Sequence, residues 1–378
     1  MDRRNFLRGL AAISAGSLLP ATAFAAARPT VLAAAWYASG ELPAPFSQGV
    51  GHYVGVLQID WAASEIRMLG AIPVPHRPHG IVAAPDGSGF YAVAFRHGGW
   101  VLHADRAGKL ITRLDSAVPD GKRTFDGHIE ISPDGKWLFT TEADVASGQG
   151  WVSVRSALTL ARVGEFPTHG IDPHQLLLDD DGMVVIANGG IDWTQDNQKR
   201  NLDRMDSSLV RINAENGELL GQWRLHDKQL SMRHIAWSTT PAGQRVLGIA
   251  MQGQHDGQEV RRAAPALALW DGKSLDIPSR SPLGLGYIGD IQPGPGGGFL
   301  MSAEIHDRAL FWHPGDAARL HLIAEMSRAA AVAPSGEDSS LFIGGEKGIA
   351  RWVLNQQSNL LAWPFPIAPD HHWAVLQG

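Results

Sequence analysis

The chain has 378 residues, of which 44% are hydrophobic and 19% are charged, with 43 Gly, 23 Pro and no Cys. This apolar content excludes a disordered chain, and the lack of Cys excludes disulfides, iron–sulfur clusters, thiolate zinc sites and a Cys nucleophile. The 32 Lys and Arg against 38 Asp and Glu give a net charge of −6 without a basic stripe, so nucleic acid is not an expected partner.

The first 25 residues predict a cleaved export signal. Residues 3–8 read Arg-Arg-Asn-Phe-Leu-Arg, the pattern of a twin-arginine signal, and Ala23-Phe24-Ala25 supplies a small-x-small cleavage site. An ordinary secretory signal or N-terminal anchor is the alternative. The apolar run between them is shorter than the roughly 20 residues that span a bilayer. We therefore expect no membrane span, export of the folded protein to the periplasm, and a single domain over residues 26–378.

A strand–turn–strand pattern recurs along the chain at intervals of roughly 40–50 residues. Each copy has a polar marker residue, a short apolar strand, a turn rich in Pro, Asp and Gly, and a second apolar strand. The markers are His79, His128, His174, His234, Asp290 and Arg328. A third strand usually follows, and a fourth is visible in places, as over residues 219–225. Four strands per unit at this period predict a β-propeller.

The two ends of the chain predict how the propeller closes. Three strands are expected over residues 31–37, 53–59 and 67–72, and none of them follows a marker residue. The tail, residues 372–376, can supply the missing innermost strand and so remove an open sheet edge. We therefore predict an all-β, seven-bladed β-propeller with four-stranded blades, closed by the C-terminal strand joining the N-terminal blade. The 13 Trp residues fit the wedges between blades.

The four His markers predict a metal site in the central funnel, because the innermost strand of each blade begins beside the central channel. A ring of imidazoles there can place several nitrogens at about 2.0–2.2 Å from one ion. Asp290 is a further ligand or an acceptor that fixes an imidazole tautomer. Either His371 or His372, at the start of the closing strand, can take the seventh marker position. Iron or copper is the expected metal, with zinc, calcium or no metal left open.

Polar residues also stand where the second strand of each unit ends, and these predict an outer ring around the His residues. They are Arg96, Glu142, Asn188, Gln252, Glu304 and Glu346. Glu142 and Glu304 are candidate metal ligands, and Glu142 is also the candidate general base of an enzyme. The others, together with Arg328, are expected to line the funnel and contact a bound group.

Three functions fit this pattern. In the first, the protein binds iron or copper and supports its uptake or homeostasis. In the second, the metal polarises a carbonyl and activates water in a hydrolase or lactonase, with Glu142 or a His as the base. In the third, the His residues are structural, as in WD-repeat propellers, and the long loops 189–207 and 253–265 dock a partner protein.

Two blade starts carry a family resemblance: Arg-Pro-His-Gly at 77–80 and Gly-His-Ile-Glu-Ile-Ser-Pro-Asp-Gly at 127–135. Over its whole mature length the chain resembles an uncharacterised family of twin-arginine-exported bacterial seven-bladed propellers. Genes of that family tend to neighbour those of imelysin-type and di-haem peroxidase-like proteins. The resemblance thus implies partners of these kinds and a periplasmic role in handling iron or copper. We expect a monomer. A looser similarity to propeller lactonases rests on a hairpin pattern that is general to propellers.

Overall fold

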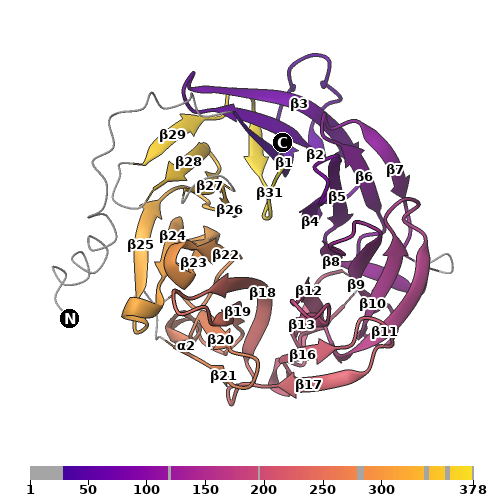
Figure 1. The fold of residues 1–378 in the computed structure, drawn as a ribbon, viewed down its shortest axis with the longest axis vertical. Helices are drawn as coiled ribbons and strands as arrows, with labels where there is room; N and C mark the ends of the chain where they lie inside the picture. The colour runs from indigo at the N-terminus through magenta and orange to yellow at the C-terminus, as the bar shows by residue number, and fades with distance from the viewer. Residues whose placement is uncertain are drawn as a thin grey trace.

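The computed structural model describes residues 29–117, 121–194, 196–278, 285–335, 340–353 and 358–376. The predicted signal, residues 1–25, lies outside the described residues. Seven antiparallel sheets surround a central axis, and a separate two-stranded hairpin adjoins them (Figure 1). The predicted seven-bladed propeller is confirmed.

Each blade is a sheet whose strands follow one another outwards from the axis. Blade 1 holds β1 (Thr30–Ala38), β2 (Gly51–Asp60) and β3 (Glu65–Val74). Blade 2 holds β4 (Pro78–Ala83), β5 (Gly89–Ala94), β6 (Val101–Asp105) and β7 (Leu110–Leu114). Blade 3 holds β8 (Arg123–Ile131), β9 (Trp137–Asp144), β10 (Gln149–Ser156) and β11 (Arg162–Ile171). Blade 4 holds β12 (Pro173–Leu178), β13 (Val184–Asn188), β16 (Ser208–Ile212) and β17 (Leu219–Trp223).

The remaining blades follow the same plan. Blade 5 holds β18 (Leu230–Thr239), β19 (Arg245–Gly253), β20 (Leu267–Trp270) and β21 (Leu275–Asp276). Blade 6 holds β22 (Asp290–Gly294), β23 (Gly298–Ala303), β24 (Arg308–Trp312) and β25 (Leu320–Glu325). Blade 7 holds β26 (Ala331–Pro334), β27 (Leu341–Gly345), β28 (Gly348–Trp352) and β29 (Asn359–Ala362). The hairpin of β14 (Asp192–Trp193) and β15 (Lys199–Arg200) is inserted within blade 4.

Among the residues that the structure describes, helices are few and short. They are α2 (Gln258–Ala263) and the 3-10 turns η1 (Leu202–Arg204), η2 (Pro295–Gly297), η3 (Glu304–His306) and η4 (Pro314–Asp316). Among the described residues, none of the helices has the length and hydrophobicity needed to cross a lipid bilayer.

The C-terminal segment completes blade 1. β30 (Ile367–Pro369) pairs antiparallel with Trp36–Ala38 of β1, and β31 (Ala374–Val375) pairs with Leu32 and Ala33 of the same strand. Figure 1 shows β31 beside the axis, between β1 and β26. The predicted closure is therefore confirmed. Over these residues the edge of β1 that faces the axis is paired with another strand and is not left open.

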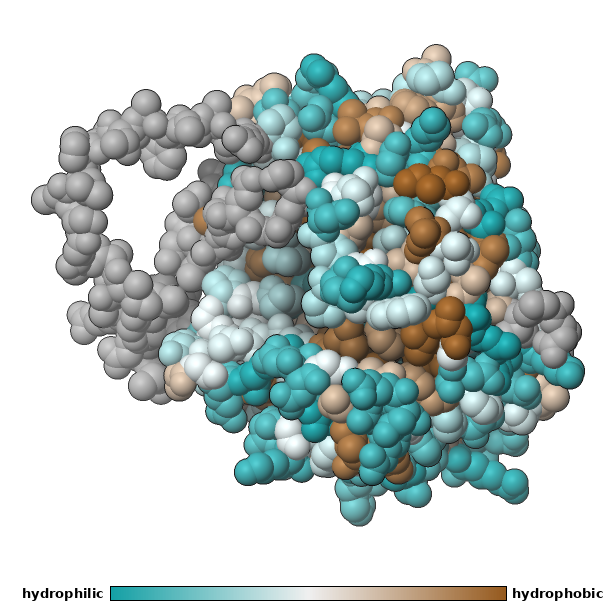
Figure 2. All heavy atoms as spheres, turned by 45° about the vertical axis from the view of Figure 1, so that its right-hand side comes forward, coloured by the Kyte–Doolittle hydropathy of each residue, from teal (hydrophilic) through white to brown (hydrophobic). Residues whose placement is uncertain are grey.

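The hydrophobic core consists of wedges between blades. One wedge joins residues of blades 1 and 7, such as Trp36 and Phe342, and another joins blades 1 and 2, such as Val54 and Trp100. Trp36, Trp100 and Trp270 are among the largest fully buried side chains, in agreement with a wedge-filling role. The outer side in Figure 2 is largely hydrophilic, with hydrophobic areas scattered among the polar ones.

The innermost strands of blades 2–5 share an irregularity at the marker residue. In β4, β12 and β18, two residues of the inner strand, one of them the His, face one residue of the neighbouring strand, and in β8 three residues face one. The inner strands of blades 6 and 7, which carry no His, pair without such a shift. Because a bulge bends the strand and re-aims side chains, it directs these four imidazoles to the axis.

We expect the closing segment to be essential for stability. Trp373 is 5% exposed and packs so tightly on blade 7 that Gly344 has no room for a Cβ. Its replacement in Trp373→Ala should lower the free energy of unfolding by about 3–5 kcal/mol, measured by urea denaturation. Trp137, which is 41% exposed, supplies the control, and Trp137→Ala should cost less than about 1 kcal/mol. Equal losses in the two variants would contradict this assignment.

Candidate metal centre

Six imidazoles meet at the axis of the propeller. Four come from the bulged strands, His79, His128, His174 and His234, and two from the closing segment, His371 and His372. Each is between 1% and 5% exposed. Neighbouring ring centroids lie between 4.4 and 6.2 Å apart. The predicted convergence of the four His markers is therefore present in the structure.

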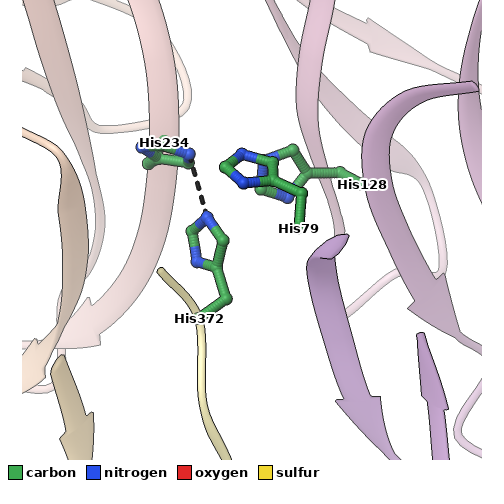
Figure 3. Close-up of side chains that lie close together, drawn as sticks. All are labelled: His79, His128, His234 and His372. Carbon is green, nitrogen blue, oxygen red and sulfur yellow. Dashed lines mark hydrogen bonds between the residues drawn. The ribbon is translucent and has the colours of Figure 1, made fainter. Parts of the chain in front are cut away.

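Four of these residues form a compact set of possible ligands. His79, His128, His234 and His372 each offer a ring nitrogen, and the four nitrogens lie within 4.8 Å of one another. Figure 3 shows these rings pointing towards a common point, with His234 Nε2 and His372 Nε2 3.0 Å apart. Nitrogens bound tetrahedrally at about 2.0–2.1 Å from a metal would be separated by about 3.3 Å. The spacing of the His234 and His372 nitrogens is close to that requirement, and the other pairs lie within 4.8 Å.

The imidazoles cannot satisfy one another by hydrogen bonding alone. His234 Nε2 faces His372 Nε2 and also His174 Nε2, which is 2.8 Å away, yet a ring nitrogen has only one proton or one lone pair. Both ring nitrogens of His79, and Nε2 of His128, are buried without a partner among the described residues. Buried polar atoms are seldom left unpaired. A bound cation would use these lone pairs, so the donor set fits a metal.

The electrostatics also favour metal binding. Burial lowers the pKa of His79, His128, His174 and His234 well below the usual value, and the neighbouring imidazoles lower it further. These four rings are therefore neutral at pH 7. A neutral imidazole has a free lone pair and needs to lose no proton from that nitrogen before it binds a metal.

Asp290 holds the ring of His372 in place. His372 is a member of the four-His set, which comprises His79, His128, His234 and His372. Its Oδ1 lies 3.2 Å from His372 Nδ1, and its carboxylate also accepts hydrogen bonds from the backbone nitrogens of Ile291 and Val332. This is the contact expected of a carboxylate that fixes the orientation of a metal-binding imidazole. His372 itself has a φ of 60°, which a non-glycine residue seldom adopts. The closing segment thus holds His372 in a strained conformation beside Asp290.

Glu304 and His371 form a separate ion pair at the edge of the cluster. Glu304 Oε2 lies 2.7 Å from His371 Nε2. Burial alone would raise the pKa of Glu304, but His371 outweighs it and holds that pKa at about 2. In turn Glu304 overcomes the effect of burial and raises the pKa of His371 above its usual value. Glu304 thus favours the charged form of His371 at the edge of the cluster.

A second potential set comprises His79, His371 and Asp370, again within 4.8 Å of one another. Both carboxylate oxygens of Asp370, however, accept hydrogen bonds from Arg77 at 2.7 Å. A cation at this place would compete with the guanidinium, so the four-His set is the better metal site.

Glu142 lies outside both ligand sets, contrary to the prediction of a metal ligand or general base. Its carboxylate is fully buried and forms an ion pair with Arg155 at 2.6 Å, where it also accepts a hydrogen bond from Thr140. The expectation failed because β9 continues to Asp144, so Glu142 stands within the strand and not at its end. There its contacts with Arg155 hold blade 3 together.

The other residues predicted for the outer ring lie in different places. Glu304, Arg328 and Glu346 line one cavity of about 330 Å³, together with Arg77 and Asp370. Glu304 lines this cavity and also pairs with His371, so the cavity lies next to the His cluster.

The remaining three residues of that ring do not share the cavity. Asn188 is buried within blade 4 and donates to the backbone oxygen of Thr168 at 2.9 Å. Gln252 is half-buried and pairs through its backbone with Tyr287. Arg96 lies over the ring of Trp193, with its guanidinium carbon 4.1 Å from the ring centroid. The outer ring is thus several separate groups.

Several charged residues around the cluster were not predicted from the sequence. Asp126, Asp172, Asp370 and Arg233 are each buried or half-buried near the axis, and Asp172 Oδ2 pairs with Arg233 Nη1 at 2.5 Å. A signal for three of them exists in the sequence. An Asp stands two residues before His128, before His174 and before His372.

Comparison with known proteins identifies a family and a fold. The chain belongs to the family described as "Protein of unknown function (DUF1513)". The match covers residues 72–376. A search of curated protein sequences finds no match.

Solved structures of other propellers are similar in shape. Hydrazine synthase from Kuenenia stuttgartiensis is 13% identical, with a TM-score of 0.56 over 83% of this chain and 92% of that chain. Virginiamycin B lyase from Staphylococcus aureus is 14% identical, with a TM-score of 0.53 over 76% and 84%. A functionally unknown protein from Desulfotomaculum acetoxidans is 11% identical, with a TM-score of 0.53 over 84% and 95%. At such identities the similarity shows the propeller fold alone.

We expect the stability of the metal-free protein to depend on pH through the neutral imidazoles. Because their pKa values are lowered in the folded state, they take up protons on unfolding below about pH 6.5. The free energy of unfolding should therefore fall as the pH is lowered from about 7 to about 5, by up to about 1.4 kcal/mol per pH unit for each ring. The pKa of His371 is raised, so this residue makes the folded protein more stable as the pH falls. Its single contribution is smaller than the combined effect of the four neutral imidazoles.

Urea denaturation at a series of pH values measures this dependence. His128→Gln should reduce the slope, whereas His76→Gln, at an exposed position, should leave it unchanged. A free energy of unfolding that is constant over this range would show that the rings are not held neutral.

Proposed function

We propose that this propeller is a metal-binding protein that holds iron or copper at His79, His128, His234 and His372. The observation that carries the proposal is the meeting of four buried ring nitrogens within 4.8 Å of one another. The unpaired nitrogens and the low pKa values support it, because the cluster is costly to build unless a cation uses its lone pairs.

The chemistry of the donors favours a borderline transition metal. Imidazole suits copper, iron, zinc and nickel, whereas calcium requires oxygen ligands. Among divalent ions copper binds nitrogen ligands most tightly, and zinc is its natural competitor. The four-His set contains no carboxylate.

We further propose that the protein acts in the periplasm, in the uptake or homeostasis of that metal. The twin-arginine pattern at residues 3–8 supports export of a folded protein, which can carry a metal loaded before transport. Burial of every ligand makes release slow without a partner, so imelysin-type or di-haem peroxidase-like proteins are proposed partners. The cavity lined by Glu304, Arg328 and Glu346 is the proposed approach, since Glu304 contacts His371.

A hydrolase is the second candidate, because a cavity of about 340 Å³ is lined in part by His128 and His372 of the four-His set and is large enough for a small substrate. A bound metal could polarise a carbonyl there. Turnover of a panel of lactones and esters by the metal-loaded protein tests this candidate, and the lack of any turnover would reject it.

The metal proposal predicts one metal ion per chain. The protein should be produced with its own signal, purified from the periplasm without a His tag, and analysed by mass spectrometry for iron, copper and zinc. His234→Ala combined with His372→Ala should abolish bound metal, because both nitrogens belong to the four-His set. His76→Ala combined with His321→Ala removes two His residues outside the cluster and should retain it. A stable wild-type protein without metal, which also fails to take up added Cu²⁺, Fe²⁺ or Zn²⁺, would overturn the proposal.

The contact between Asp290 and His372 predicts a smaller effect. Asp290→Asn should weaken metal binding by about 10–100-fold, because His372 loses the charged acceptor that orients it. Competition with a chelating dye measures this change. Asp316→Asn is the matched control, since Asp316 lies 3.3 Å from His321 in blade 6, away from the cluster. Equal affinity of Asp290→Asn and wild type would show that His372 is not a ligand.

A further inference from the structure

A second site lies beside the His cluster, in a cavity of about 260 Å³ formed by blades 3 and 4 with His97 of blade 2. The inserted hairpin of β14 and β15 supplies part of its wall through Trp193 and Arg200. Asp126 and Asp172 line it, and each stands two residues before a His of the cluster. The hairpin therefore covers a space that the metal proposal does not use.

The polar groups in this cavity have unused hydrogen-bonding capacity. Asp126 is 2% exposed, and its Oδ2 has no hydrogen-bond partner among the described residues. The same is true of Asp172 Oδ1 and Thr124 Oγ1, which also line the cavity. An ionised carboxylate only accepts hydrogen bonds, whereas a hydroxyl both donates and accepts. A ligand that donates to Asp126 and Asp172 and accepts from Thr124 would use these atoms.

Four Asp residues line the cavity, Asp126, Asp144, Asp172 and Asp192, and each has an Arg close enough to offset its charge. Asp172 is paired with Arg233, and Asp192 with Arg200 at 2.8 Å. Arg96 lies near Asp126, and Arg123 lies near Asp144. A strongly charged ligand of either sign would upset this balance, so a neutral ligand fits better.

Apolar groups complete the wall. Ala143, Val145, Ile171 and Ile191 line the cavity together with the indole of Trp193. The guanidinium of Arg96 lies over that indole and fixes its position. The cavity, at about 260 Å³, lies just below the usual range for ligand sites of about 300–1,000 Å³, so it admits a single small ring. An apolar wall opposite carboxylates suits a ring with C–H faces and hydroxyl edges.

We propose that this cavity binds a small neutral polyhydroxylated molecule, such as a monosaccharide or a cyclitol. Its hydroxyl groups donate to Asp126 and Asp172 and accept from Thr124, while its ring lies against Trp193 and the aliphatic side chains. This site is independent of the metal at the four-His set. A divalent cation at Asp126 is the competing occupant.

Saturation-transfer NMR on the full-length protein tests the proposal. The probes are D-glucose, D-galactose, D-mannose, D-ribose and myo-inositol, each at up to 10 mM, and separately Ca²⁺ and Mg²⁺ followed by calorimetry. At least one of the five polyols should bind. Its affinity should fall at least tenfold in Asp126→Asn and in Trp193→Ala. Asp203→Asn changes an exposed Asp that follows the same hairpin and should leave the affinity unchanged.

Two further measurements make the outcome decisive. Circular dichroism and metal content confirm that each variant is folded with its metal centre unaltered, so that loss of polyol binding reports on the cavity alone. Binding of Ca²⁺ or Mg²⁺ that Asp126→Asn abolishes, with none of the polyols bound, would overturn the proposal in favour of a cation site. No binding of any probe, or polyol binding unchanged in both Asp126→Asn and Trp193→Ala, would also overturn it.

Discussion

Closure of the ring by the C-terminal segment is the constraint on which the rest of the structure depends. The segment pairs with β1 on both sides of a short loop, and that loop carries Asp370, His371 and His372 to the axis. Without it, blade 1 would have an open inner edge and the four-His set would lose one of its members. The residues that complete the fold therefore also complete the candidate metal site.

The His cluster is held by features that a simple propeller blade does not need. Bulges interrupt the inner strands of the four blades that carry His, and His372 has a positive φ. The bulges interrupt regular strand pairing, and the positive φ strains the backbone. The His rings that these features bring together also have unpaired nitrogens. Departures from local rules that converge on one point are typical of a functional site. This convergence argues against a purely structural role for the His residues, which would be satisfied within their own blades.

The sequence predicts the blades well because each depends on local signals. The turns after His79 and His128, both Pro-Asp-Gly, fix a hairpin within a few residues, and the repeated spacing fixes the number of units. The convergence of four His residues follows from their shared position in that repeat. The failure at Glu142 has the opposite cause, because its partner Arg155 comes from the next strand and the end of β9 is two residues further on. Similarly, the cavity at Asp126 depends on a hairpin from another blade, which no local pattern around Asp126 reveals.

The distribution of charge around the axis bears on which metal the proposed site would hold. Burial holds His79, His128 and His234 of the four-His set neutral, so these ligands do not offset the charge of a bound ion. The carboxylates around the set have cationic or His partners: Asp290 has His372, Asp370 has Arg77, Asp172 has Arg233, and Glu304 has His371. They cannot approach the metal without giving up these partners. Ferric iron favours anionic oxygen ligands, and the four-His set offers none, so we expect it to bind weakly here. Cuprous, cupric or ferrous ions, whose affinity for imidazole is high and whose charge is lower, match a neutral nitrogen site.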